Sequence, residues 1–371
     1  MRRALATADS GVDIATTGRV PTLEQWLSHW LDEIASRRVR PSTLATYRGY
    51  VQNRIIPELG KHRLDRLQPE HLERFYHRLE AEGLAAATVL QIHHIVSRAL
   101  KVAMQRGKVA RNVATLVDAP SVQQREVQPL TVEEARAVLA CAVPLRNASR
   151  WSVALALGLR QGEALGLLWD DVDLDAGILR VRNALQRQRG RGLVLVAPKS
   201  RAGRRSIPLP AQLLQSLHIH KTAQTAERLR AGSTWQDQGF VFATPTGSPV
   251  DPRNDHATWK RLLETAGVRP ARLHDARHTA ATLLLTQGVP ARVAMEILGH
   301  SQVSLTLGTY SHVSTELSRD ATTRVGDALW QSTPETLAAS LAASRRRTAP
   351  LPPKDAGQGW AAWGSNPEPT D

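Results

Sequence analysis

The 371-residue sequence has one cysteine and few lysines, and both shortages narrow what the protein can be. A single cysteine, Cys141, excludes intrachain disulfides and zinc sites built from several thiolates. It lies in Ala-Val-Leu-Ala-Cys-Ala-Val, so we expect a small buried core residue rather than a nucleophile. The chain has 7 lysines against 41 arginines. One arginine therefore carries little information, and a lysine at a predicted site carries more.

Long apolar runs are also missing, whereas positive charge is in excess. No stretch approaches the ~20 apolar residues of a membrane-spanning helix, and the start lacks the apolar core of a signal peptide. The 48 Lys and Arg residues exceed the 34 Asp and Glu residues, for a formal net charge of +14. Because such an excess attracts polyanions, we expect a nucleic-acid partner, no membrane partner and a cytoplasmic, nucleoid-associated protein.

The first third of the chain shows four helical patterns within residues 21–112, behind a polar arm at 1–20. A capping box at Thr22-Leu-Glu-Gln25 opens the first helix. The second follows Pro41 and is predicted to end at Pro57. The third runs from near Pro69 to Gly83, and the fourth from about Thr88 to Gly107. These patterns predict a compact four-helix domain.

A second, mixed domain is predicted for residues 130–330, after a linker at 113–129 and before a disordered basic tail at 331–371. Another capping box, Thr131-Val-Glu-Glu134, opens it. Helices are expected near 211–229 and from 244 to about Trp330. Strands are expected at Ile178–Leu185, Leu193–Ala197, Arg205–Leu209 and Phe240–Ala243. The fold class is thus mainly α with a small β-sheet.

Five short strings in this second domain contain six residues that suit chemistry on a phosphodiester. The strings are Gly-Leu-Arg-Gln-Gly-Glu (158–163), Pro-Lys-Ser-Arg-Ala-Gly-Arg-Arg (198–205), His-Asp-Ala-Arg-His-Thr (274–279), Leu-Gly-His-Ser (298–301) and Thr-Tyr-Ser-His-Val (309–313). The residues are Arg160, Lys199, His274, Arg277, His300 and Tyr310. Each string alone is a weak signal, and the five in this order are a strong one.

Two arginines, Arg160 and Arg277, could clamp the charge that develops on the phosphate, with the bidentate geometry that favours arginine over lysine. The plainer interpretation of each is one surface arginine among 41. No Asp/Glu pair clusters near the candidates in the sequence, so we expect no metal and no cofactor. Lys199, in a predicted turn, could protonate the leaving 5′-oxygen, or it could simply face water.

Tyr310 is the predicted nucleophile. A free phenol has a pKa of about 10, so it needs a base or nearby cations, which His274 and His300 could supply together with the arginines. A core tyrosine is the alternative. The other three tyrosines, Tyr47, Tyr50 and Tyr76, all lie in helical patterns of the first domain.

Two further residues are predicted to support the site. On a helix, His278 shares one face with His274. A metal site formed by the two histidines is an alternative interpretation, but the sequence lacks the glutamate of the His-Glu-x-x-His type. Glu163 follows Arg160 by three residues and is expected to orient a neighbouring arginine or histidine. An ordinary surface salt bridge is the alternative for Glu163.

From about Thr22 to Val313, the five strings in this order resemble the tyrosine recombinase (phage integrase) family. The resemblance implies a SAM-like helical core-binding domain and a mixed α/β catalytic domain that clamp double-stranded DNA. It also implies attack by a tyrosine, a 3′-phosphotyrosyl intermediate and strand exchange in a homotetramer. The matching residues are Arg160, Glu163, Lys199, His274, Arg277, His300 and Tyr310.

The sequence departs from the family in two places. Ala276 stands where many relatives have leucine, which is expected to spare catalysis. Only about 20 residues precede the first helix, so either the protein recognises core sites alone or an arm-binding domain lies upstream of the given start. The tail string Trp363-Gly-Ser-Asn-Pro367 can be encoded by a tRNA T-arm consensus, so one hypothesis is that the gene end overlaps its attachment site; an arbitrary disordered tail is the alternative.

The leading interpretation is the integrase of a phage or mobile element, with a directionality factor and a DNA-bending host protein as candidate partners. An Xer-type resolution recombinase is the main alternative. A type IB topoisomerase shares the tyrosine chemistry but fits the helix-rich first domain less well. A basic DNA-binding regulator would explain the charge, yet not the joint presence of the six candidate residues.

Overall fold

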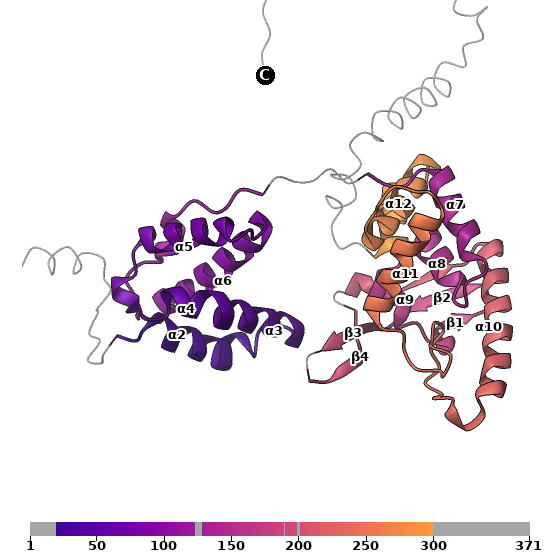
Figure 1. Cartoon of the computed structure of the whole chain (residues 1–371), viewed down its shortest axis with the longest axis horizontal. Helices are drawn as coiled ribbons and strands as arrows, with labels where there is room; N and C mark the ends of the chain where they lie inside the picture. The colour runs from indigo at the N-terminus through magenta and orange to yellow at the C-terminus, as the bar shows by residue number, and fades with distance from the viewer. Residues whose placement is uncertain (1–19, 123–127, 189, 199–200, 300–371) are drawn as a thin grey trace, which may run out of the picture. The chain divides into compact units, whose positions relative to one another are not determined.

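The computed structural model describes residues 20–122, 128–188, 190–198 and 201–299 (Figure 1). Within these ranges the chain is mainly helical, with two small antiparallel sheets, which confirms the predicted fold class. Residues 1–19 of the predicted arm, the helices predicted beyond 299 and the predicted basic tail lie outside the described residues.

The first described part is a helical bundle with one continuous apolar core. It comprises α2 (Leu23–His29), a π-helical turn (Trp30–Ala35), α3 (Pro41–Tyr50), a second π-helical turn (Val51–Ile55), α4 (Ile56–Leu59), α5 (Pro69–Ala81) and α6 (Ala86–Gln105). The Trp26 indole N–H donates to the Ala99 carbonyl at 3.0 Å, joining α2 to α6. The predicted capping box is confirmed, since Thr22 and Gln25 exchange both bonds.

The prediction that Pro57 ends the second helix is wrong. The helix continues from α3 through the π-helical turn into α4, and Pro57 lies in the first turn of α4. In the π-helical turn the Ile56 N–H bonds to the Val51 carbonyl, five residues back. A proline has no backbone N–H to donate within a helix. The π-helical turn before Pro57 already interrupts the regular α-helical hydrogen bonds, so the helix changes geometry there and continues.

The start of the predicted linker belongs to the first core. A 3₁₀ turn forms at Val113–Leu116, and Val113, Ala114 and Val117 are buried with the helices of the bundle. Asn112 caps this turn by accepting the Ala114 N–H and binds back to α6 through Ser97. Three apolar side chains buried in five residues therefore extend the packed unit past the predicted boundary at 112.

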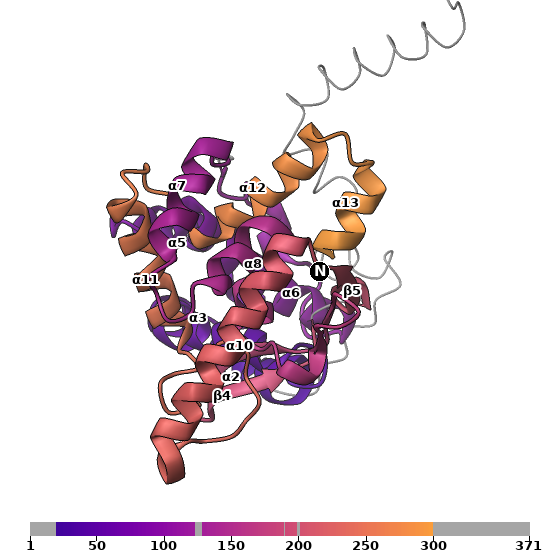
Figure 2. The ribbon, with the colours of Figure 1, turned by 90° about the vertical axis from the view of Figure 1, so that its right-hand side faces the viewer.

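The second described part, residues 128–299, combines helices with the sheets. Its helices are α7 (Val132–Ala142), α8 (Ser149–Leu157), α9 (Gln161–Leu165), α10 (Ala211–Ala231), α11 (Pro252–Thr265), α12 (Leu273–Thr286) and α13 (Ala291–Leu298). The apolar helix α8 packs against α7, α10 and α12, and α12 packs against α13. Figure 2 shows α10 running beside α8. The capping box of Thr131 and Glu134 at the start of α7 is confirmed.

The strands form two antiparallel sheets rather than one. The first sheet has the order β1 (Val172–Asp173), β2 (Ile178–Val181), β5 (Arg205–Pro208), and the second pairs β3 (Ala184–Gln188) with β4 (Gly192–Val196). The predicted strand 178–185 is therefore divided, because its halves pair with different partners. The predicted strand at Phe240–Ala243 is also wrong: those residues form only isolated bridges, to Leu168 and Pro249.

Two apolar clusters place the ends of α8 and α9 in the domain interior. One gathers the sheet and α10 around Leu159, Ala164 and Phe242, and the other joins α7, α8, α11 and α12 around Trp151 and Trp259. Cys141, predicted to be buried, is only partly buried at the edge of the second cluster. Among the described residues, none of the helices is both long and apolar enough to span a membrane.

Candidate active site

The candidate site begins where α8 ends, at a glycine that the packing requires. Gly158 caps α8 in the left-handed conformation, with φ of 61°. A Cβ at this position would lie 2.5 Å from Leu298 Cδ2 and 3.1 Å from Ala280 Cβ. Only glycine therefore lets the end of α8 approach α12 and α13 so closely.

Arg160 leaves this turn as the N-cap residue of α9. Its Nη1 donates to Glu163 Oε1 at 2.6 Å, and its backbone N–H donates to Glu163 Oε2 at 3.1 Å. The Arg160 side chain is 40% exposed, whereas that of Glu163 is 4% exposed. The Arg160 guanidinium is thus accessible to solvent, whereas its partner, the Glu163 carboxylate, is buried.

Glu163 is shared between two arginines. Its Oε2 also accepts from Arg205 Nη2 at 3.1 Å, and the Arg205 side chain is almost fully buried. Burial of the carboxyl acts to raise the pKa of Glu163, but the charges of Arg205 and Arg160 outweigh burial and the pKa is lowered. The predicted supporting residue is therefore an ionised, buried carboxylate, and not an ordinary surface salt bridge.

Arg277 lies in α12 and is held by backbone carbonyls. Its Nη1 donates to the Gly158 carbonyl at 2.7 Å, and its Nη2 donates to the Leu298 carbonyl at 2.5 Å. Two carbonyls from different elements fix the plane of the guanidinium. Only 2% of the Arg277 surface is exposed, so a phosphate reaches it only if the covering atoms move.

Three arginines from three elements meet the C-terminal end of α13. Three consecutive carbonyls accept from them: Ile297 from Arg205 Nε (2.6 Å), Leu298 from Arg277 Nη2 (2.5 Å) and Gly299 from Arg160 Nη2 (3.2 Å). The last carbonyls of a helix have no partner within the helix and carry the negative end of its dipole. This end of α13 therefore gathers both predicted clamp arginines directly before His300 in the sequence.

His274 and His278 lie in the first two turns of α12, with ring centroids 5.1 Å apart and perpendicular planes. His274 is exposed to solvent. Loss of water around its ring, followed by His278, Arg277 and Arg160, lowers the pKa of His274 to about 4. Burial also lowers the pKa of His278. Both rings are therefore neutral at pH 7, and a neutral imidazole can accept a proton.

The structure brings five of the eight predicted site residues together: Arg160, Glu163, His274, Arg277 and His278. Lys199, His300 and Tyr310 lie outside the described residues. Arg205 was missed, although it stands in the 198–205 string, because a single arginine among 41 is not informative. Within the described ranges, no group of three or more His, Cys, Asp or Glu side chains could hold a metal ion.

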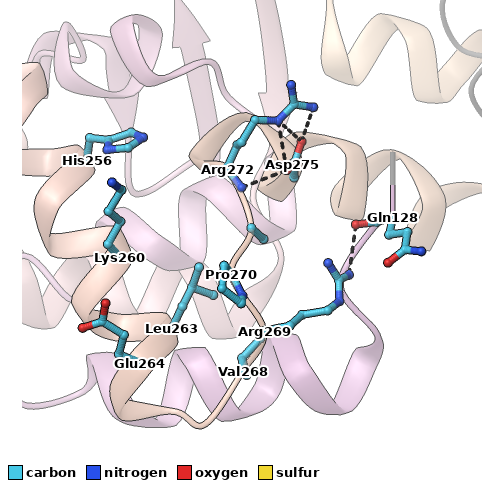
Figure 3. Close-up of a pocket in the computed structure, with 11 residues that line it drawn as sticks. Gln128, His256, Lys260, Leu263, Glu264, Val268, Arg269, Pro270, Arg272 and Asp275 are labelled. Carbon is cyan, nitrogen blue, oxygen red and sulfur yellow. Dashed lines mark hydrogen bonds and ion pairs between the residues drawn. The ribbon is translucent and has the colours of Figure 1, made fainter. Parts of the chain in front are cut away.

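A pocket of about 700 Å³ lies on another side of α12, between the loop after α11 and the start of α12 (Figure 3). Arg272 and Asp275 pair across its rim at 2.9 Å, and Arg269 donates to the Gln128 carbonyl at 3.0 Å. Among the predicted site residues that the structure describes (Arg160, Glu163, His274, Arg277 and His278), none lines it. The candidate site is thus a convergence of helix ends, separate from this pocket.

Comparisons with known proteins show the family of this chain. Residues 128–316 match the phage integrase family, and residues 22–79 match its N-terminal SAM-like domain. An integrase of Saccharopolyspora erythraea is 39% identical, over 87% of this chain and 85% of that protein. The chain belongs to the phage integrase family. It is a site-specific tyrosine recombinase, and the recombinase interpretation of its five sequence strings is confirmed.

Other relatives show the breadth of the family. A XerC-like tyrosine recombinase of Caldanaerobacter subterraneus is 29% identical, over 82% of this chain and 83% of that protein. A Tn1549 transposon integrase bound to transposon right end DNA superposes with a TM-score of 0.69 at 21% identity, covering 82% and 99% of the two chains. A lambda integrase tetramer bound to a Holliday junction gives 0.59 at 21%, covering 82% and 80%. These structures show that the fold is shared.

Proposed function

We propose that this recombinase cuts and rejoins double-stranded DNA through Tyr310, with Arg160 and Arg277 stabilising the phosphate. One observation carries the proposal: the two arginines, 117 positions apart in the sequence, donate to the neighbouring carbonyls of Leu298 and Gly299. Two fixed guanidinium groups at one place suit the extra negative charge of a five-coordinate phosphorus.

The reaction follows from the residue types. The Tyr310 oxygen attacks the scissile phosphorus, forming a 3′-phosphotyrosyl bond while the bond to the 5′-oxygen breaks. The Lys199 ammonium gives its proton to that oxygen, which leaves as a hydroxyl. His274, whose ring is neutral at pH 7, and His300 take up or share the phenol proton. Rejoining reverses these steps, with a 5′-hydroxyl as the nucleophile.

The remaining tyrosines support the choice of Tyr310. Tyr76 is buried in the core of the first domain, where burial raises its pKa. Tyr47 and Tyr50 pack against the same core. Three tyrosines thus have packing roles, and Tyr310 alone follows the site residues in the sequence.

We also propose DNA attachment sites as the substrate, a homotetramer on DNA and integration of a mobile element. Two similar structures support the first two, since they are a transposon integrase bound to transposon right end DNA and an integrase tetramer bound to a Holliday junction. Identity is higher with the integrase (39%) than with the XerC-like protein (29%), which supports the third. A directionality factor and a DNA-bending protein are further proposed partners.

The test is a denaturing-gel assay for a covalent protein–DNA adduct, with EDTA in the buffer. Nicked duplexes taken from the DNA that flanks the gene serve as substrates, with Tyr310→Phe alongside. We expect an adduct with the wild type and none with Tyr310→Phe, which should still shift DNA on a native gel. An adduct formed by Tyr310→Phe would refute the nucleophile, and an EDTA-sensitive adduct would refute metal-independent chemistry.

A further inference from the structure

Arg205, the first residue of β5, has its hydrogen-bonding fork committed to protein groups. Nε donates to the Ile297 carbonyl at 2.6 Å, Nη1 to the Gly203 carbonyl at 3.1 Å and Nη2 to Glu163 at 3.1 Å. Its side chain is 6% exposed. Each of the three guanidinium nitrogens thus donates to a protein group, as suits a residue that acts through its protein partners.

We propose that Arg205 is a positioning residue that keeps the Arg160 guanidinium oriented toward the scissile phosphate and offsets the negative charge of Glu163 beside it. This inference rests on the proposed function of Arg160. Arg205 contacts the carboxylate that holds Arg160 and a carbonyl beside the one that Arg160 contacts. Arg205 therefore connects the two groups that hold the Arg160 side chain, which are the Glu163 carboxylate and the C-terminal end of α13.

The charge count at the carboxylate explains why an arginine is needed there. Glu163 contributes one negative charge, and Arg160 and Arg205 contribute two positive charges, so the trio is left with a net charge of +1. Without Arg205, Arg160 and Glu163 would form a neutral pair. That pair would attract a phosphate less, and the carboxylate would hold Arg160 more strongly in competition with DNA.

The packing of Gly299 against Arg205 also supports a positioning role. Gly299 has a positive φ of 69°, and a Cβ there would lie 2.8 Å from Arg205 Nη1 and from the Ala202 carbonyl. The chain just before His300 thus packs directly on the Arg205 guanidinium. Shortening or replacing this side chain would leave the Ile297 and Gly203 carbonyls without their donor.

The experiment measures the single-turnover rate of adduct formation by Arg205→Met, which removes the charge and the fork at similar length. We expect the rate to fall by about 10- to 100-fold, less than the ~10²–10³ of a direct transition-state donor. Native-gel DNA binding should be nearly unchanged. Arg205→Lys, which keeps the charge without the fork, should fall between Arg205→Met and wild type.

The deciding readout is rescue by a second change. Arg205→Met combined with Glu163→Gln restores a net charge of +1 at Arg160, so the double variant should react faster than Arg205→Met alone. A purely structural role predicts a double variant as slow as, or slower than, the single one, and that result would overturn the proposal. Circular dichroism at the assay temperature shows that each variant is folded.

Arg146→Met is the matched control. Arg146 also pairs with a carboxylate, Glu227, and bonds to the Ala243 carbonyl in the same domain. Its side-chain hydrogen-bond partners include none of the five described site residues. It should lower the melting temperature and leave the adduct rate close to wild type. If wild type forms no adduct, the proposed function fails. If wild type and Arg205→Met react equally fast, only the role of Arg205 fails.

Discussion

Substituting Gly158 by alanine tests whether close helix packing builds the site. Gly158 and Gly267 have similar positive φ values, 61° and 65°, and both follow a helix in the second domain. A Cβ at Gly158 would lie 2.5 Å from Leu298 Cδ2, whereas a Cβ at Gly267 would meet nothing within 4 Å. Gly267→Ala therefore measures the backbone cost alone, and Gly158→Ala adds the collision.

The magnitudes follow from this difference. Alanine in the left-handed region costs about 1–2 kcal/mol of unfolding free energy at either position. Overpacking against Leu298 and Ala280 costs a further ~1–3 kcal/mol at Gly158. Gly158→Ala should thus lose about 2–5 kcal/mol in all. At ~3 °C per kcal/mol for a domain of this size, it should melt about 3–9 °C below Gly267→Ala.

The assay is thermal unfolding of the two full-length variants, followed by adduct formation at a temperature where both are folded. The Gly158 carbonyl accepts from Arg277 Nη1 at 2.7 Å, so moving the end of α8 should also slow adduct formation. Gly267→Ala should react at the wild-type rate. Equal melting temperatures for the two variants would refute the steric reasoning. Equal adduct rates for Gly158→Ala and Gly267→Ala would show that the packing of α8 does not affect the chemistry.

Two further predictions follow from the buried charges. Arg277→Lys keeps the positive charge but lacks the planar fork that bridges the Gly158 and Leu298 carbonyls. Adduct formation should therefore fall by about 10²–10³-fold, while DNA binding is kept. Near-normal cleavage by this variant would remove Arg277 from the site. Because the pKa of Glu163 is lowered on folding, its stabilisation is present above the unfolded value of 4.5 and is lost as pH falls through the lower folded pKa. Glu163→Gln should therefore be less stable than wild type at pH 7, by about 2–4 kcal/mol of unfolding free energy. This difference in stability should narrow below pH 4.5. A difference that does not change with pH would contradict an ionised Glu163.

Short-range patterns in the sequence predicted much of the fold. The capping boxes of Thr22 and Thr131 start helices where expected, because both partners lie within four residues. The apolar spacing of α5 and α6 likewise reports which faces are buried. Pro57 shows the limit of such rules: a proline stops a regular α-helix, but the sequence does not reveal that the preceding turn is π-helical.

The family and the candidate residues were also predictable, since the five strings keep their order along the chain. Membership in the phage integrase family is confirmed over residues 128–316. Glu163 was expected to orient a neighbouring arginine or histidine, and in the structure it holds Arg160 and Arg205. The roles of Lys199, His300 and Tyr310 stay predictions, because those residues lie outside the described ranges.

The network around Arg205 could be found only in the tertiary structure. Its partner Glu163 lies 42 residues away in the sequence, and its partner Ile297 lies 92 residues away. The close approach of Gly158 to Leu298 joins residues that lie 140 positions apart. From the sequence alone one can say which chemical groups are present and which helices they begin or end. Only the packing of α8, β5 and α13 decided that three arginines meet at one helix end, because that meeting depends on contacts between distant segments.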